Sequence, residues 1–267
     1  MKVSVSQFAS GPDVAANLTT VLHHIEVAAG QNARLIAFPE ASMVAFASTR
    51  DELRIHAEQW SAEFVQQVAQ AARKHGIDVF VGVYEPNGEP RSSNVIVHAT
   101  AAGIIAGRYE KVHLYDAFNF RESDKNRAAA VSPSHQEVYV ADVEGIKFAL
   151  LNCYDLRFPE IARLALDKGA DALVYGAGWI AGSLKELHWE TLLKARAIEN
   201  TAFVLGSCQP PPESVGMSMI VDPNGLTLAG VAANCGIATA NIELDRLREV
   251  REVLPCLAHR RYRVTAA

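Results

Sequence analysis

The fold is decided by the stretch Ile146–Glu160, which reads I-K-F-A-L-L-N-C-Y-D-L-R-F-P-E. Its continuous apolar run at residues 148–151 is typical of a strand that is buried on both faces. Pro159 is a residue favoured at the first position of a helix, and the apolar spacing after it carries this helix to a cap at Gly169. The pattern therefore predicts that Cys153 lies on the turn between a buried strand and a helix.

Two interpretations of Cys153 follow from this position. A turn at a strand end lifts a side chain out of the core, and a nearby helix N-terminus would lower the pKa of the thiol from its ordinary value of about 8.5. Such a thiol would suit a nucleophile. Alternatively, Cys153 is a small core hydrophobe, which is the commoner role of a free cysteine. Position alone leaves both interpretations open.

The composition argues against several classes of partner. The chain has 267 residues, of which 49% are hydrophobic and 21% charged, and its formal charge is −5. Because its basic clusters are no longer than His259-Arg260-Arg261, we expect no nucleic-acid partner and no anionic membrane surface. No apolar run approaches the roughly 18 residues of a membrane span, and the N-terminus alternates like a strand without a secretory signal.

The cysteines indicate a cellular compartment and the absence of a metal site. They lie at positions 153, 208, 235 and 256 and form no C-x-x-C pair. This spacing matches neither a disulfide framework nor a zinc site, and it fits a reducing environment. We therefore expect a cytoplasmic protein without a bound metal.

Helical and strand patterns alternate along the chain. Helices are predicted at about 14–30, 61–75, 159–168, 184–199 and 244–254, and strands at 3–8, 34–38, 78–84, 94–99, 103–109, 137–143, 146–151, 172–176, 202–206, 217–221, 226–229 and 237–242. A dozen strands are too many for one compact open sheet. Two mixed sheets packed face to face, with helices on the outer faces, accommodate this pattern. Since no linker interrupts it, we expect one domain over 1–267, with a long loop at about 115–135.

Three predicted strands each end in a reactive residue. Glu40 follows L-I-A-F-P, Lys111 follows G-R-Y-E, and Cys153 follows A-L-L-N. Sites in α/β folds collect at strand ends. A thiol, a carboxylate and an ammonium that converged there would be able to perform acyl transfer. Alternatively, Glu40 is a surface acid and Lys111 a solvated lysine, because spacing alone does not bring the three together.

The blocks that contain these residues are F-P-E at 38–40, Y-E-K-V-H-L at 109–114 and N-C-Y-D-L-R-F-P-E at 152–160. In this order they resemble the three signature blocks of the nitrilase superfamily of carbon–nitrogen hydrolases. The resemblance continues through H-W-E-T-L-L-K-A-R-A-I-E-N at 188–200, S-M-I-V-D-P-N-G at 218–225 and H-R-R at 259–261. It covers nearly the whole chain.

The resemblance implies a fold and a set of catalytic residues. The fold would be α/β (α+β in some schemes), a four-layer α-β-β-α sandwich of two mixed six-stranded sheets. Glu40 would be the general base, Lys111 the electrostatic stabiliser and Cys153 the nucleophile, with no metal or organic cofactor. Glu122 in F-R-E-S-D matches a further glutamate of the family; a plain loop salt bridge is its alternative. Members typically form homodimers, and the tail at about 255–267 would lie at the subunit interface.

The resemblance also implies acyl transfer through a thioester, with the oxyanion held by Lys111 and the backbone N–H of Tyr154. The block C-Y-D-L-R-F-P-E is similar to small amidases, including ω-amidases, whereas true nitrilases usually have tryptophan where Tyr154 stands. We therefore expect ammonia release from a small, carboxylated amide. The loop at 115–125 is shorter than in typical ω-amidases, and residues 126–130 depart from the family's Pro-Gly-Asp.

Two further residues are candidates for substrate binding. Trp179 would stack on the substrate, or pack in the core or an interface. Arg157 would bind a substrate carboxylate, or form an ion pair with Asp155 beneath the turn. The alternatives for the whole protein are an N-carbamoyl amino acid amidohydrolase, a nitrilase that uses the same triad, and a catalytically silent sandwich that only binds metabolites.

Overall fold

Strands from both ends of the chain form the first sheet. The structure is a computed structural model that describes residues 1–265. The strand order is β15-β1-β2-β3-β4-β5, with β8 beside β4. The bounds are β1 (Lys2–Gln7), β2 (Leu35–Ala37), β3 (Asp78–Glu85), β4 (Ser92–Ala99), β5 (Ile105–Glu110), β8 (Asn126–Arg127) and β15 (Gly236–Asn241). The prediction of six strands is wrong for this sheet, because β8, within the segment expected to be a loop, pairs with the start of β4 and makes seven.

The second sheet has the six strands that were predicted, in the order β14-β13-β12-β11-β10-β9. The bounds are β9 (Val140–Val143), β10 (Ile146–Asn152), β11 (Ala172–Ala177), β12 (Phe203–Cys208), β13 (Met219–Val221) and β14 (Thr227–Gly230). Three neighbouring strands are parallel (β10, β11 and β12), and the others are antiparallel to their neighbours. Strands β15 to β5 of the first sheet repeat these orientations, with β1, β2 and β3 parallel. Both sheets are therefore mixed, as predicted.

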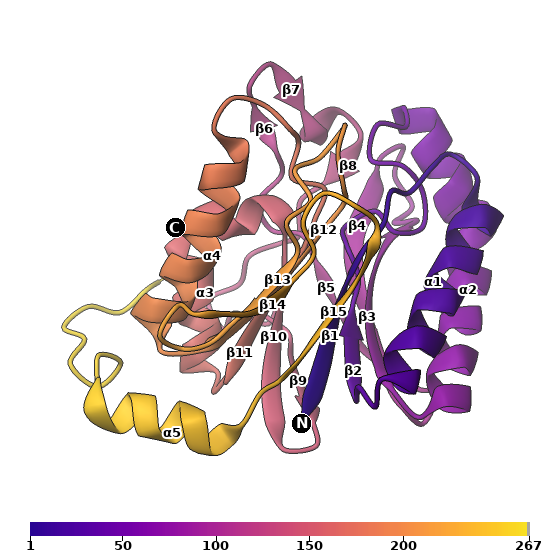
Figure 1. The fold of residues 1–267 in the computed structure, drawn as a ribbon. Coiled ribbons are helices and arrows are strands. Elements are labelled where there is room, and N and C mark those ends of the chain that lie inside the picture. Colours follow the sequence, from indigo (N-terminus) through magenta and orange to yellow (C-terminus); the bar gives the residue numbers. More distant parts are fainter. Residues whose placement is uncertain (266–267) are drawn as a thin grey trace.

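The helices connect the parallel strands and lie outside the sheets. Their bounds are α1 (Val14–Gly30), α2 (Arg50–His75), α3 (Pro159–Asp167), α4 (Lys185–Asn200) and α5 (Leu244–Val253). In Figure 1, α1 and α2 flank the first sheet on one side of the molecule, and α3 and α4 flank the second sheet on the opposite side. Each of these four is a crossover between neighbouring parallel strands, which is the usual role of a helix in such sheets.

Helix α2 begins earlier than predicted, at Arg50 instead of about residue 61. Its first turn is closed by a capping box, in which Thr49 and Glu52 each accept a hydrogen bond from the other's backbone N–H. Leu53 and Ala57 extend the buried face over the added turns. The capping-box motif of Thr49 and Glu52 is present in the sequence. It was not used in the prediction because the apolar periodicity of the turns after it is weak.

Two hydrophobic clusters fill the interior. The larger contains side chains from both sheets, such as Val5 and Phe80 from the first and Phe148 and Leu150 from the second. The two sheets therefore pack against each other. The smaller cluster lies between the first sheet and its helices, and includes Ile25, Phe64 and Val68.

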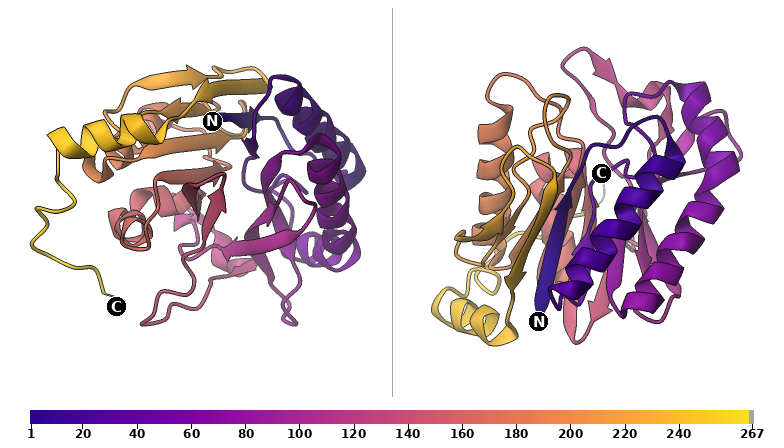
Figure 2. Two further views of the ribbon diagram at one scale, coloured as in Figure 1. Left: turned by 90° about the horizontal axis from the view of Figure 1, so that it is seen from below. Right: turned by 45° about the vertical axis from the view of Figure 1, so that its right-hand side comes forward.

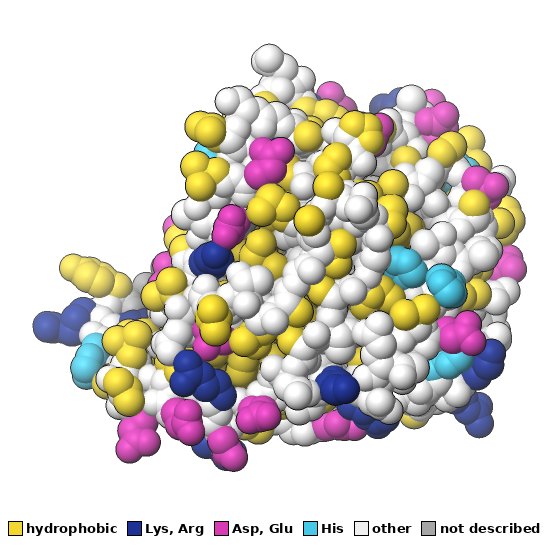
Figure 3. Space-filling model, in the orientation of Figure 1, with side chains coloured by type: hydrophobic (Ala, Val, Ile, Leu, Met, Phe, Trp, Pro, Cys, Tyr) yellow, Lys and Arg dark blue, Asp and Glu magenta, His cyan; other side chains and the backbone are white. Residues whose placement is uncertain are grey.

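The chain after α5 leads away from the sheets, as the left view of Figure 2 shows. It then passes α3, where Arg260 forms an ion pair with Asp167. Charged side chains of both signs gather over α5 on the face in Figure 3. The prediction for the tail at 255–267 includes residues 266–267, which lie outside the described residues. No helix within 1–265 is both long enough and apolar enough to span a membrane.

Candidate active site

Strand ends from both sheets bring three predicted residues together. Glu40 follows β2, Lys111 follows β5, and Cys153 follows β10 directly. The side chains of Glu40 and Lys111 are fully buried, and Cys153 is 6% exposed. The site therefore lies at the junction of the two sheets and is shielded from bulk water.

The turn that carries Cys153 is a short 3₁₀ helix, η2 (Cys153–Arg157), as the strand–turn–helix pattern predicted. Cys153 has a φ of 46°, a left-handed conformation that is rare for a residue with a side chain. Asp155 holds the turn from inside, since its Oδ2 accepts hydrogen bonds from Asn152 N at 2.8 Å and from the Tyr109 hydroxyl at 2.6 Å. Arg196 fixes the other side by donating to the Leu156 carbonyl at 2.7 Å. These contacts over-determine the strained turn.

Lys111 lies between two carboxylates. Its Nζ donates to Glu40 Oε1 at 2.7 Å and to Glu122 Oε2 at 2.7 Å. Asn94 ties the same two acids together, donating from Nδ2 to Glu40 Oε1 at 2.8 Å and to Glu122 Oε1 at 3.0 Å. All three charged side chains have zero exposure, so the salt bridge between Glu122 and Lys111 is buried.

Within residues 1–265, the Glu122 carboxylate accepts four hydrogen bonds. Besides Lys111 and Asn94, its donors are the backbone N–H of Tyr115 at 2.8 Å and Asn126 Nδ2 at 3.0 Å. Two donors at each of its oxygens fill the acceptor positions of this buried carboxylate. The loop that carries Glu122 contains the short hairpin β6 (Asp116–Ala117) and β7 (Phe120–Arg121) and the 3₁₀ turn η1 (Glu122–Asp124), which hold it in place.

The backbone at Glu40 passes between the two sheets, in close contact with a glycine of each. A Cβ at Gly82 of β3 would lie 2.5 Å from the Pro39 carbonyl oxygen, and a Cβ at Gly176 of β11 would lie 3.2 Å from Glu40 N. Only glycine leaves this space free. Gly178 N then donates to Glu40 Oε2 at 2.9 Å, and Gln209 donates to the Glu40 carbonyl at 2.8 Å. Both sheets therefore set the position of this carboxylate.

The predicted fall in the pKa of the Cys153 thiol is wrong. Burial is the main cause that raises this pKa well above its ordinary value, and the negative charge of Glu40 adds to it. Lys111 lowers the thiol pKa, but by less than these two effects raise it. Burial acts to lower the pKa of Lys111 itself, yet Glu122 and Glu40 together raise it well above its usual range. The resting site therefore combines a neutral thiol with a charged lysine.

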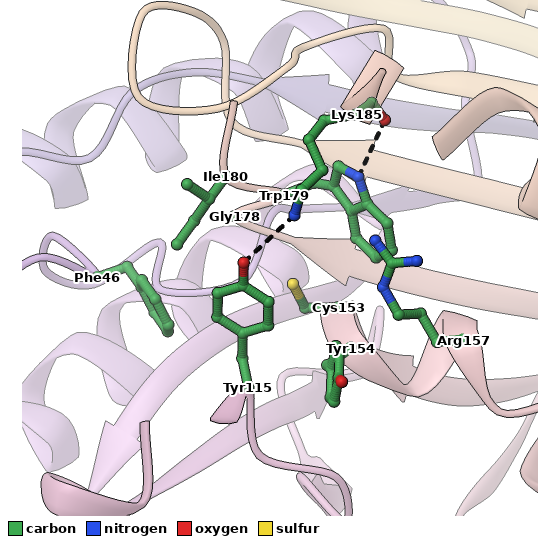
Figure 4. A pocket seen from close by; sticks show the side chains of 9 residues that line it. All are labelled: Phe46, Tyr115, Cys153, Tyr154, Arg157, Gly178, Trp179, Ile180 and Lys185. Carbon is green, nitrogen blue, oxygen red and sulfur yellow. Dashed lines mark hydrogen bonds between the residues drawn. The ribbon is translucent and has the colours of Figure 1, made fainter. Parts of the chain in front are cut away.

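A pocket opens over Cys153, with about 260 Å³ of free space that includes the part open to solvent (Figure 4). Its lining residues are Phe46, Tyr115, Cys153, Tyr154, Arg157, Gly178, Trp179, Ile180 and Lys185. In Figure 4, Arg157 and Trp179 lie on one side of Cys153, and Phe46 and Ile180 on the other. The predicted residues Tyr154, Trp179 and Arg157 are thus all at the pocket wall.

Two cations of this pocket have no acidic partner among residues 1–265. Arg157 lies over the Trp179 ring, 4.6 Å from its centroid, and its Nε is buried without a hydrogen-bond partner. Lys185 is 6% exposed, and its Nζ bonds to the Tyr115 hydroxyl at 3.2 Å. Burial, followed by the charge of Arg157, lowers the pKa of Lys185. Two cations of one pocket without an acidic partner among residues 1–265 favour an anionic ligand group.

The expected ion pair between Asp155 and Arg157 is not formed. Asp155 bonds instead to His113, whose Nδ1 is 2.8 Å from Oδ1. Sequence reasoning missed Asn94 and Lys185, because a polar residue within a strand and a lysine in the first turn of a helix carry no distinctive local signal. Within 1–265, no group of three or more His, Cys, Asp or Glu side chains is arranged to hold a metal ion.

Comparisons with known sequences find similarity along most of the chain. The profile of the family described as "Carbon-nitrogen hydrolase" matches residues 2–252. The chain is 33% identical over 262 residues to a deaminated glutathione amidase of Escherichia coli, covering 98% of each protein. It is 32% identical to a deaminated glutathione amidase of Synechocystis, covering 95% of this chain and 96% of that one.

Solved structures show the same fold. The Caenorhabditis elegans NitFhit protein superposes with a TM-score of 0.89 and 27% identity over 97% of this chain. This chain spans only 65% of that protein. The Nit3 protein of Saccharomyces cerevisiae, described as a member of the nitrilase superfamily, superposes with a TM-score of 0.85 and 26% identity, covering 98% of this chain and 97% of that one.

Proposed function

Because this chain belongs to the carbon–nitrogen hydrolase family of the nitrilase superfamily, we propose that it hydrolyses a small, carboxylated amide and releases ammonia through a thioester on Cys153. The family and its amidase-named relatives make the protein a carbon–nitrogen hydrolase, which sets the catalytically silent sandwich aside. One observation carries the proposal. A thiol beside a buried carboxylate shares its pocket with two cations, Arg157 and Lys185, that have no acidic partner in the described part of the chain, residues 1–265.

In the proposed first step, Cys153 Sγ attacks the amide carbon while its proton passes to Glu40. The developing oxyanion is held by the Tyr154 backbone N–H and by Lys111. A lysine ammonium has three donors, and Glu40 and Glu122 use two of them. The third is therefore available for the oxyanion. Glu40 then protonates the nitrogen, the C–N bond breaks, and ammonia leaves the thioester behind.

The second step reuses the same groups. Glu40 takes a proton from water, and the water oxygen attacks the thioester carbon. The C–S bond then breaks, Glu40 returns the proton to the Cys153 sulfur, and the acid is released. The raised pKa of the thiol supports this assignment, because a neutral thiol needs a base at the moment of attack. Glu122 is proposed to position Lys111.

The substrate class is proposed from the charges of the pocket. A carboxylate would be bound by Arg157, which stacks on Trp179, and by Lys185. Trp179 would then contribute to substrate binding mainly by holding the Arg157 guanidinium in position. The amidase names of the relatives favour an amide over a nitrile. N-Carbamoyl amino acids also carry a carboxylate, so they are the second candidate.

The test is ammonia release from a panel of succinamate, glutaramate, 2-oxoglutaramate, N-carbamoyl amino acids and aliphatic nitriles. We expect release from the ω-amides that is abolished by iodoacetamide and in Cys153→Ala. Rapid quenching with mass spectrometry should find the acyl group on Cys153. Carbon dioxide release from the carbamoyl substrates alone would select the second candidate, and turnover without an acyl-cysteine would refute the thioester.

The assembly is a separate proposal. We propose that the sheets and helices form a four-layer α-β-β-α sandwich within one domain over 1–267, and that two copies form a cytoplasmic homodimer with the tail at 255–267 at their interface. The basic tail beside α3 supports this proposal. Light scattering after size exclusion should give twice the monomer mass, and deletion of the tail should weaken the dimer.

A further inference from the structure

A further buried lysine, Lys125, lies beside the catalytic pocket. It follows the 3₁₀ turn η1 that carries Glu122, and it is 8% exposed. Its backbone is fixed twice, because Lys125 N donates to the Glu122 carbonyl at 3.0 Å and Ser92 N of β4 donates to the Lys125 carbonyl at 3.1 Å. The side chain of Lys125 therefore extends from a base that is tied to the first sheet.

The ammonium of Lys125 binds a loop that is distant in sequence. Its Nζ donates to the Phe46 carbonyl at 2.5 Å and to the Ser48 carbonyl at 3.1 Å. Both carbonyls belong to a turn that Ser48 N closes by donating to the Ala45 carbonyl at 3.1 Å. Among residues 1–265, Lys125 has no acidic partner, so these carbonyls are its polar ligands.

Two aromatic rings complete the surroundings of this ammonium. Lys125 Nζ lies over both of them, 4.8 Å from the centroid of the Phe46 ring and 5.0 Å from that of the Phe120 ring. The two rings stack on each other, with centroids 5.4 Å apart and an interplanar angle of 28°. Because a cation is attracted to the face of an aromatic ring, Lys125 holds the Phe46 side chain as well as its carbonyl.

The charge of Lys125 depends on these contacts. Burial lowers the pKa of Lys125, although the charges of Glu122 and Glu40 act to raise it. A buried cation costs free energy unless other groups replace its hydration. One of the two carbonyls and one of the two rings that do so belong to Phe46. An uncharged side chain at position 125 would therefore release Phe46 from both ties.

Phe46 forms one wall of the catalytic pocket. It lies on the side of Cys153 opposite Arg157 and Trp179, as Figure 4 shows. The centroid of its ring is 5.7 Å from Lys111 Nζ, the ammonium that is proposed to hold the oxyanion. The position of this ring thus limits the space of a substrate that Arg157 holds from the other side.

We propose that Lys125 is a positioning residue of the pocket, which acts on the substrate through Phe46. The inference rests on the proposed function and deepens it. Lys125 does not itself line the pocket. Its ammonium holds the Phe46 ring against the bound amide, and this contact keeps the amide carbon over Cys153.

A double-mutant cycle on the full chain tests the route through Phe46. Lys125→Met, Phe46→Ala and the double variant are compared with wild type on the best ω-amide of the panel. We expect Lys125→Met to raise KM about tenfold, the worth of a charged hydrogen bond, and to change kcat less than threefold, since a wall contributes to ground-state and transition-state binding alike. In the Phe46→Ala background, the same replacement should change KM less than twofold, because the two residues share one contact.

The matched control is Lys168→Met. Lys168 also donates from Nζ to two backbone carbonyls, those of His135 and Val138, but it follows α3 and does not line the pocket. This control should leave KM unchanged. If Lys125→Met does not fold, Lys125→Gln takes its place, because an amide also lacks the charge that attracts the two rings.

Iodoacetamide labelling of Cys153, measured by mass spectrometry, gives a second readout that needs no turnover. We expect Lys125→Met to be labelled at least threefold faster than wild type, and the double variant no faster than Phe46→Ala. Unchanged KM and labelling in Lys125→Met, or effects that add to those of Phe46→Ala, would overturn the inference while the proposed function stands. If wild type hydrolyses no amide of the panel, the proposed function fails, and the labelling rates alone decide the inference.

Discussion

Replacing Glu122 by glutamine should destabilise the protein more than the same replacement of Glu40, although Glu40 is the proposed base. The carboxylate of Glu122 accepts two hydrogen bonds at each oxygen. A glutamine NH₂ must therefore oppose two donors in either orientation. In Glu40, Oε1 accepts from Lys111 and Asn94, whereas Oε2 accepts from Gly178 N. Its glutamine can turn the NH₂ toward Gly178 N, which is the one hydrogen-bond donor to Oε2 among residues 1–265.

The magnitude follows from the count of lost partners. A buried group left without its hydrogen bond costs about 1–3 kcal/mol, so Glu122→Gln should lose about 2–6 kcal/mol and Glu40→Gln about 1–3 kcal/mol. Both variants remove one negative charge beside Lys111, so this shared cost cancels in the comparison. The remaining difference of about 1–3 kcal/mol corresponds to about 2–12 °C in Tm for a chain of this size.

Thermal unfolding and amidase assays on the two variants test this reasoning. We expect Glu122→Gln to unfold at the lower temperature and to retain measurable turnover, since Cys153 and Glu40 are intact. Glu40→Gln should unfold later and lose about 10²–10⁴ in kcat, as expected for a missing general base. Equal Tm values, or an earlier transition in Glu40→Gln, would refute the hydrogen-bond argument.

Three further results are expected. The raised pKa of Cys153 keeps the folded thiol protonated, whereas the unfolded thiol ionises above about pH 8.5. The contribution of this thiol to the free energy of unfolding is therefore present at neutral pH and is lost as pH rises. Relative to Cys153→Ala, wild type should lose about 2 kcal/mol of stability between pH 8.5 and 10. If urea unfolding gave the same change in unfolding free energy with pH for both proteins, this prediction would be wrong. Arg157→Met and Lys185→Met should each raise KM for carboxylated amides about 10- to 100-fold, the worth of a charged hydrogen bond, and leave propionamide hydrolysis unchanged; an equal effect on both substrates would exclude carboxylate binding. Gly82→Ala, whose Cβ would meet the neighbouring backbone, should lower kcat at least tenfold, whereas Gly30→Ala, with no atom within 4 Å, should have no effect on rate assays.

Local patterns were sufficient for some features of the site. The strand, Pro159 and Gly169 all lie close to Cys153 in sequence, so the turn could be predicted and was confirmed. The second sheet and the outer helices followed from periodicity in the same way, except for the first turns of α2. Such signals need only neighbouring residues, because the strand and helix periods are properties of the local backbone.

Other features depend on contacts between distant residues. Glu40 and Lys111 are 71 residues apart, and only the family resemblance suggested that they meet. The sign of the pKa shift at Cys153 was mispredicted because a local helix-terminus argument omits burial and the charge of Glu40. Lys185 was missed because its burial depends on the distant aromatic residues Tyr115 and Phe118.

The close packing of the Glu40 backbone against two glycines affects when the protein becomes active during folding. Gly82 belongs to one sheet and Gly176 to the other, and the Glu40 backbone passes between them. The carboxylate therefore reaches its place only after the two halves of the chain have docked. During refolding, secondary structure should recover first, and enzymatic turnover should report the docking of the halves. Separately produced halves, cut between β8 and β9, would then be expected to be inactive alone and to gain turnover when mixed.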